Sequence, residues 1–202
     1  MLEIRSAATE RLRIKRSGKT LFTPGPFLKW AGGKSQLLPT FVRYFPKKFN
    51  RYHEPFLGGG AVFFHLASRI PQMRATISDG NEELINCYKM IRDYPYEVLE
   101  ALKLHRNDKH HFYKIRAQDT ARLSNPERAA RLVFLNKTCF NGLYRVNRSG
   151  QFNVPFGKYK NPKFVDEKNI FAVSDILTHA DILHSPFETI LQRAKKGDFV
   201  YL

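Results

Sequence analysis

The residues best suited to chemistry gather around a run of three glycines, Gly58 to Gly60. The stretch from Arg51 to Leu57 has the length and aromatic content of a strand, and apolar side chains recur at helical spacing from Ala61 on. A strand that turns through glycines into a helix brings bare backbone amides close to a ligand, because no Cβ atom intervenes. The pattern predicts a nucleotide-type pocket, although three glycines would also suit a plain tight turn.

An acid at the end of the next strand-like segment strengthens the pocket interpretation. Residues 74–79 have strand character and end in Asp79, about twenty residues beyond the glycines, the spacing at which a dinucleotide-binding fold offers a carboxylate to a ribose diol. Asp79 and Asn81 could instead cap the helix expected from Glu82, and one side chain can do both.

Charge and composition narrow the class of protein. The chain has 202 residues, of which 43% are hydrophobic, so it can bury the core of one domain or of a domain with a large insertion. Its net charge of +16 with 13% aromatic residues indicates a folded protein with a polyanionic partner, and nucleic acid is the first candidate.

Other partners and settings are disfavoured. No apolar run approaches the length that crosses a bilayer, so we expect no membrane partner. The two cysteines, Cys87 and Cys139, are too few for a disulfide framework and lack metal-ligand spacing. We therefore expect no metal site and a reducing, cytoplasmic setting.

A second glycine loop, Gly32-Gly33-Lys34-Ser35, ends like a phosphate-binding P-loop. The P-loop pattern requires a glycine five positions before Gly33, where Leu28 stands, so that interpretation is rejected. What remains is a loop that carries Lys34, with a helix expected from about Ser35. A cation beside free amides suits a carboxylate group.

The start and the middle of the chain differ in character. Residues 1–24 are basic with few large apolar side chains, and we expect a disordered leader, with a DNA-touching arm or an organellar presequence as alternatives. After the second strand, the pattern predicts a helical block with helices over 82–93, 96–105, 109–118 and 126–138, the last capped by Asn125.

A basic hairpin is expected after the helical block, turning at Arg148-Ser149-Gly150. Residues 131–168 carry eight basic and two acidic side chains, interleaved with aromatic residues. Such a surface suits phosphate contacts and base reading or stacking, although a merely solvated hairpin is the alternative. The α/β rhythm then returns, with helices over 166–178 and 186–194 and strands over 181–184 and 198–202.

From about Pro26 to Leu202 the chain resembles the Dam family of DNA adenine methyltransferases, which use S-adenosylmethionine. The resemblance rests on four motifs: residues 27–34 (FLKWAGGK), 54–63 (EPFLGGGAVF), 79–81 (DGN), and 141–145 (NGLYR) with 152–157 (FNVPFG). It implies a Rossmann-like α/β methyltransferase fold with an inserted target-recognition domain made of helices and a β-hairpin. The methyltransferase catalytic domain would be formed by residues 25–81 and 166–202, and the target-recognition insertion by residues 82–165.

By this resemblance, the enzyme would be monomeric and methylate the exocyclic amino group of adenine in duplex DNA. In its cofactor site, Trp30 and Lys34 would hold the methionine end, and Gly58 and Gly60 would allow close backbone approach. Asp79 would accept from the ribose hydroxyls, and Phe187 would lie against the adenine ring. Phe56 would belong to the same site. Arg145 would read a guanine edge, because its fork can bond two major-groove acceptors. The other expected DNA contacts are Lys29, Phe140, Asn141, Leu143, Pro155, Lys158, Tyr159 and Lys160.

The family's catalytic Asp-Pro-Pro-Tyr would follow directly after Leu202, so we expect a truncated chain without methylation activity. A cytosine methyltransferase is excluded, because neither cysteine follows a proline. Two alternatives remain. One is a non-catalytic module that binds cofactor and DNA, and the other is a dinucleotide-dependent oxidoreductase. The oxidoreductase is disfavoured because Phe63 occupies the position of the third glycine in the Gly-x-Gly-x-x-Gly pattern. The target sequence, for which GATC is a guess, and a restriction or regulatory role stay open.

Overall fold

One parallel sheet organises the protein. The computed structural model describes residues 22–33 and 36–202. The sheet has four strands in the order β3-β2-β1-β4, and every neighbouring pair is parallel. Its strands are β1 (Tyr52–Glu54), β2 (Ala75–Asp79), β3 (Ala180–His184) and β4 (Phe199–Val200). The predicted α/β class is confirmed.

The two central strands form because both of their faces are covered. Tyr52 and Ile77 have no exposed surface, and Glu54 pairs in register with Ile77. The first strand is shorter than the expected 51–57, because Pro55 has no amide hydrogen to continue the ladder. The last is shorter than the expected 198–202.

The helices match the sequence pattern with corrections at their ends. They are α4 (Glu82–Asp93), α5 (Pro95–Lys103), α6 (Lys109–Arg116), α7 (Asn125–Thr138) and α8 (Glu167–Leu177). Asn81 caps α4 as predicted, accepting from the Leu84 amide. The predicted cap of α7 was wrong: Ser124, not Asn125, is the cap, because it forms a reciprocal capping box with Glu127.

Two predicted helices are shorter or broken. The helix expected from Ser35 begins only at Leu38, as α2 (Leu38–Phe41), and runs into the 3₁₀ turn Val42–Tyr44. The helix expected over 186–194 divides into the 3₁₀ turn Phe187–Thr189 and α9 (Ile190–Arg193). The leader 1–24 lies almost wholly outside the described residues, as do Lys34 and Ser35.

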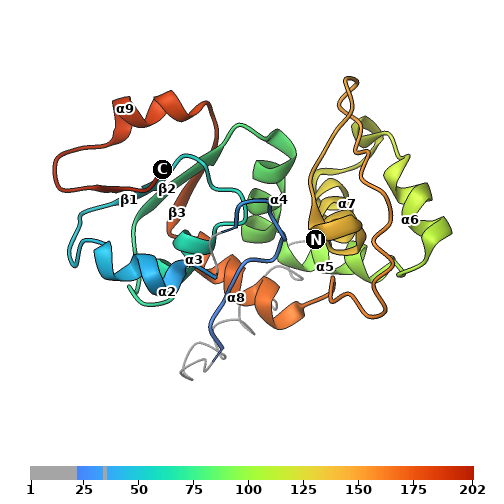
Figure 1. The fold of residues 1–202 in the computed structure, drawn as a ribbon, viewed down its shortest axis with the longest axis horizontal. Helices are drawn as coiled ribbons and strands as arrows, with labels where there is room; N and C mark the ends of the chain where they lie inside the picture. The colour runs from blue at the N-terminus through green and yellow to red at the C-terminus, as the bar shows by residue number, and fades with distance from the viewer. Residues whose placement is uncertain (1–21, 34–35) are drawn as a thin grey trace, which may run out of the picture.

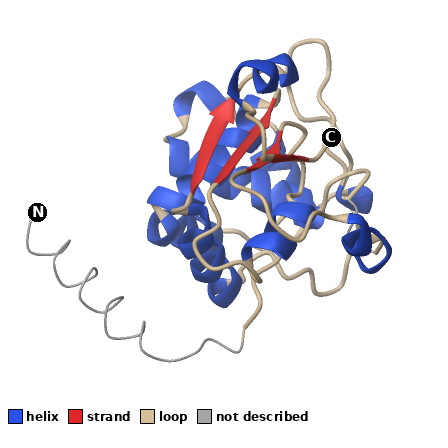
Figure 2. Ribbon diagram, turned by 90° about the vertical axis from the view of Figure 1, so that its left-hand side faces the viewer, coloured by secondary structure: helices blue, strands red, loops and turns tan. Residues whose placement is uncertain are grey.

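Helix α4 connects the sheet to the helical block. It contacts β2 and β3 of the sheet as well as α7 and α8, and α5 and α6 pack on α7. Figure 1 shows α5, α6 and α7 beyond α4, away from the strands, and Figure 2 shows the strands among the surrounding helices. Helix α3 (Ala61–Ala67) follows the glycine run, as the sequence predicts. None of the helices in the described part is long and apolar enough to cross a membrane.

The segment predicted as a hairpin is held by isolated bridges rather than by strands. Antiparallel bridges pair Val146 with Phe152 and Cys139 with Phe156. At the tip, the Asn147 amide donates to the Gln151 carbonyl over 2.9 Å. We refer to residues 145–153 as the basic loop. In Figure 1 it extends upward in amber beside α7.

Candidate functional site

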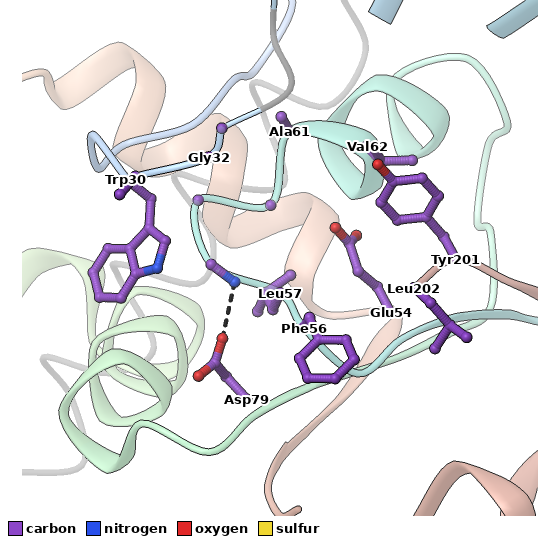
Figure 3. Close-up of a pocket in the computed structure, with 15 residues that line it drawn as sticks. Trp30, Gly32, Glu54, Phe56, Leu57, Ala61, Val62, Asp79, Tyr201 and Leu202 are labelled. Atoms are coloured by element: carbon purple, nitrogen blue, oxygen red, sulfur yellow. Dashed lines mark hydrogen bonds between the residues drawn. The ribbon is translucent and has the colours of Figure 1, made fainter. Parts of the chain in front are cut away.

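A cavity of about 340 Å³ opens at the carboxyl ends of β1 and β2. This is the edge at which open α/β sheets bind ligands. Five predicted cofactor residues line it together: Trp30, Phe56, Gly58, Gly60 and Asp79. In Figure 3, Trp30 and Asp79 lie at one end of this cavity, and Glu54 and Tyr201 lie toward the other. We call it the glycine-loop pocket.

The loop is built around two glycines with left-handed backbone. Gly58 has φ +48°, and a Cβ atom there would lie 2.7 Å from Cδ1 of Trp30. Gly60 has φ +67°, and its Cβ would lie 2.7 Å from the Tyr88 hydroxyl oxygen. Both positions therefore require glycine. The loop packs Trp30 directly against its backbone, which shapes one wall of the pocket.

Asp79 ties the loop to the end of β2. Its Oδ2 accepts from the Gly58 amide at 3.0 Å (Figure 3), and its Oδ1 accepts from the Asn81 amide at 2.9 Å. The carboxylate lies in the pocket and retains further lone pairs on each oxygen. The amides of Gly58 and Gly60 donate within the protein, to Asp79 and to the Leu57 carbonyl, so these two glycines offer close approach rather than free amides.

Two phenylalanines form an exposed stack at the edge of the pocket. The rings of Phe56 and Phe187 lie 5.1 Å apart between centroids and are inclined by 28°. They are 56% and 46% exposed. A ring inserted between them would need roughly 7 Å, twice a carbon contact distance, so a third ring would stack on an open face or displace Phe187. Among the predicted cofactor residues that the structure describes, Phe187 is the one that does not itself line the pocket.

Glu54 is a pocket residue that the sequence reasoning missed. It ends β1 with 3% of its surface exposed, and its Oε2 accepts from the Tyr52 hydroxyl at 2.8 Å and the Phe63 amide at 3.1 Å. Burial raises its pKa from 4.5 to about 8, although both hydrogen bonds oppose the shift. An acid at the end of the predicted strand, four positions before the glycine run, was the signal that could have found it.

The Glu54 carboxyl should make folding stability fall as the pH rises from about 5 to about 8. In this window the folded protein keeps a proton that the unfolded chain has released, so the stabilisation is full below the unfolded pKa and is lost as the pH approaches the folded one. Glu54→Gln keeps one oxygen acceptor for Tyr52 and Phe63 and removes the titration. Urea unfolding at a series of pH values should show a flatter profile for Glu54→Gln than for the wild type.

Glu97→Gln is the matched control for this pH profile, because Glu97 is exposed on α5. Its profile should follow that of the wild type. Parallel pH profiles for Glu54→Gln and the wild type would show that Glu54 does not titrate in this window.

A second cavity, of about 390 Å³, brings together three of the predicted DNA residues. Lys29, Tyr159 and Lys160 line it, and the Lys29 ammonium lies 4.2 Å from the centre of the Tyr159 ring. The prediction missed Lys137 here, whose pKa is lowered by burial first and then by Lys29. Lysines around an aromatic ring suit contact with a polyanion.

The other predicted DNA residues lie in or beside the basic loop: Phe140, Asn141 and Leu143 come before it, Arg145 begins it, and Pro155 and Lys158 follow it. Phe140 is 51% exposed, and its amide donates to the Pro155 carbonyl at 2.8 Å. Asn141 and Lys158 are exposed and have positive φ, +54° and +56°. Leu143 is half-buried in the core. Phe140 and Pro155 thus present adjacent surface, apart from the lysine cavity.

Arg145 is exposed, but its guanidinium is held by a neighbour. Nε donates to the Asn153 side-chain oxygen at 2.7 Å, and Nη2 donates to the Asn153 carbonyl at 3.4 Å. The Asn153 amide donates in turn to the Arg145 carbonyl at 3.0 Å. Asn153 therefore orients the arginine fork at the root of the basic loop.

Comparison with known proteins places this geometry in a family. The family model for D12 class N6 adenine-specific DNA methyltransferases matches residues 30–202. The chain is 46% identical over 184 residues to the type II methyltransferase M1.LlaDCHI of Lactococcus lactis, covering 87% of this chain and 63% of that protein. It is 42% identical over 194 residues to the type II methyltransferase M.MjaIII of Methanocaldococcus jannaschii, covering 87% and 67%.

A DNA adenine methylase of Haemophilus influenzae is 35% identical over 193 residues, covering 93% of this chain and 65% of the relative. The chain thus spans about two thirds of the length of the relatives that it matches. The matched residues include the whole glycine-loop pocket and both predicted DNA surfaces, apart from Lys29. The chain belongs to the D12 class N6 adenine-specific DNA methyltransferase family.

Proposed function

We propose that this protein serves site-specific methylation of the exocyclic amino group of adenine in duplex DNA, with S-adenosylmethionine as the methyl donor. The observation that carries the proposal is the glycine-loop pocket, in which Asp79 and two left-handed glycines meet at the carboxyl edge of a parallel sheet. The family membership supports the substrate and the donor.

The residues of the pocket fit this cofactor. S-adenosylmethionine carries a ribose diol, an adenine ring and a positively charged amino acid with a sulfonium. Asp79 can accept from the diol, and the Phe56 and Phe187 stack offers an exposed aromatic face. Glu54 lines the same pocket, and a bound cation would favour the ionised form of its carboxyl, which burial disfavours in the free protein. The volume of about 340 Å³ lies in the range of small-molecule sites. When bound, the cofactor would supply the electrophilic methyl group.

The chain's own residues would orient and shield this group. Gly58 and Gly60 let the backbone approach, while Trp30 forms the wall toward the DNA surface. We retain Lys34 as a partner for the cofactor carboxylate, as a proposal from the sequence alone. The insertion 82–165 would recognise DNA, and a monomeric, cytoplasmic protein remains part of the proposal.

Arg145→Ala should relax recognition of one base pair. A bidentate contact to guanine is worth about 1–3 kcal/mol of discrimination, or roughly a 5- to 150-fold preference. We expect this preference to disappear at one position when binding to a GATC duplex is compared with binding to its single-base variants. Uniform loss of affinity with unchanged base preference would contradict the assignment.

Arg148→Ala is the matched control, since Arg148 is exposed at the tip of the same loop. As a phosphate contact it should weaken binding to every duplex alike and lower the salt slope by about one.

The 202 residues contain no Asp-Pro-Pro-Tyr, the tetrapeptide that the Dam resemblance assigns to activating the adenine amino group. We therefore propose that this polypeptide by itself binds cofactor and DNA without transferring the methyl group. A purified sample incubated with labelled S-adenosylmethionine and duplex DNA should leave the adenines unlabelled, and a version extended by that motif should label them. Labelling by the 202 residues alone would refute this part.

A non-catalytic binding module is the second candidate function. The observation that favours it is that the described residues already assemble the pocket and the DNA-facing lysines. Binding of both ligands by a protein that never methylates, even when extended, would favour it.

The type II relatives suggest a role in restriction and modification.

A further inference from the structure

Tyr144 lies between the glycine-loop pocket and the predicted DNA surface. Its ring stacks on Trp30, with centroids 5.2 Å apart and planes inclined by 22°. Trp30 lines the glycine-loop pocket, and Arg145, which follows Tyr144, begins the basic loop. One aromatic pair therefore joins a wall of the pocket to the root of the loop.

Tyr144 also contacts the segment that follows Asp79. Burial raises the pKa of its hydroxyl, and a hydrogen bond with the Asn81 side chain opposes that shift. Asn81 donates its amide to Asp79 at 2.9 Å. The tyrosine is thus linked to both Trp30 and the segment that carries Asp79.

Two further contacts make the root of the basic loop continuous with the pocket. The ring of Tyr144 meets Phe152 edge-on at 5.9 Å, and Phe152 forms the bridge with Val146. The buried Asn136 side chain accepts from the Lys29 amide and donates to the carbonyls of Lys29 and Gly142, at 2.7, 2.7 and 2.9 Å. Asn136 therefore fixes the segment before Trp30 to the segment before Tyr144.

We propose that Tyr144 is a positioning residue that couples cofactor binding to DNA binding. The proposal rests on the proposed function. A ligand that fills the pocket restricts the Trp30 ring, the stacked Tyr144 transmits that restriction to Arg145 and Phe152, and the cost of ordering this part is then incurred once for both ligands. Couplings of this kind change affinity by about 5- to 150-fold, and by the same factor in both directions.

The test compares DNA affinity with and without saturating S-adenosylhomocysteine, which fills the cofactor site without a transferable methyl group. For the wild-type chain we expect at least about fivefold tighter DNA binding with this ligand. Tyr144→Leu should bring the ratio of the two affinities to about one, and Tyr144→Phe, which keeps the ring, should retain most of it. Arg148→Ala should lower both affinities and leave the ratio unchanged.

A reciprocal readout separates coupling from a loss of fold. Trp30 is the single tryptophan of the chain, so its fluorescence reports S-adenosylhomocysteine binding directly. Saturating DNA should tighten this binding in the wild type by the same factor, and Tyr144→Leu should remove the effect while circular dichroism stays unchanged.

Each outcome separates the two proposals. The role of Tyr144 is overturned if the wild type binds both ligands but its DNA affinity is the same with and without S-adenosylhomocysteine. It is also overturned if Tyr144→Leu keeps the wild-type ratio of these two affinities. Either result leaves the proposed function standing. A folded wild type that binds neither ligand overturns both.

Discussion

Asp79→Ala should weaken S-adenosylmethionine binding by at least about 100-fold, because hydrogen bonds to a charged group contribute roughly 1.5–3 kcal/mol each. The substitution removes the proposed acceptors of the ribose diol. It also releases the amides of Gly58 and Asn81, which now donate to the two carboxylate oxygens at 3.0 and 2.9 Å. Calorimetry on the purified variant measures the loss.

Two further variants define the cause of that loss. Asp79→Asn keeps one oxygen acceptor and turns an amide group toward a backbone donor, so an intermediate loss is expected. Asp93→Ala removes an exposed carboxylate paired with Arg92 at the far end of α4 and should bind like the wild type. An Asp79→Ala affinity within threefold of the wild type, about 0.6 kcal/mol, would mean that the ribose is held elsewhere.

Gly58→Ala should abolish measurable cofactor binding and lower stability. The left-handed backbone at φ +48° costs an alanine roughly 1–2 kcal/mol, and its methyl group would lie 2.7 Å from the Trp30 ring. Relief requires Trp30 to leave its place in the pocket wall or the loop to abandon the contact between Gly58 and Asp79. Calorimetry and thermal unfolding measure both effects.

Gly25→Ala is the control for Gly58→Ala. A Cβ atom at Gly25 has no neighbour within 4 Å, and its backbone is not left-handed. This variant should retain wild-type affinity and nearly wild-type stability. Undiminished binding by Gly58→Ala would show that the loop can rearrange around a side chain and that the glycine is dispensable.

Local patterns were sufficient to predict the elements that frame the pocket. The apolar strand before Asp79, the cap at Asn81 and the helix after the glycine run all depend on neighbours in sequence, and the structure has them where the pattern predicts. Asp79 bonds to the Asn81 amide, as a capping residue would, and also faces the pocket.

Contacts between distant segments were beyond such patterns. The acid at Glu54 is visible in the sequence, but its burial and raised pKa depend on how Tyr52, Phe63 and the sheet enclose it in the folded protein. The stack of Phe56 on Phe187 and that of Trp30 on Tyr144 each join residues more than a hundred positions apart, and nothing in their local sequence indicates the partner. Ser124 was missed as a cap because Asn125 beside it suits the same role.

The most direct test of the account is a calorimetric titration of the 202-residue chain with S-adenosylmethionine and, separately, with NAD. We predict saturable one-to-one binding of S-adenosylmethionine and no binding of NAD, since Asp79 and the glycine loop form a pocket without a third glycine at Phe63. A folded chain that binds NAD instead, or binds neither compound, would contradict the assignment of this pocket to a methyl donor.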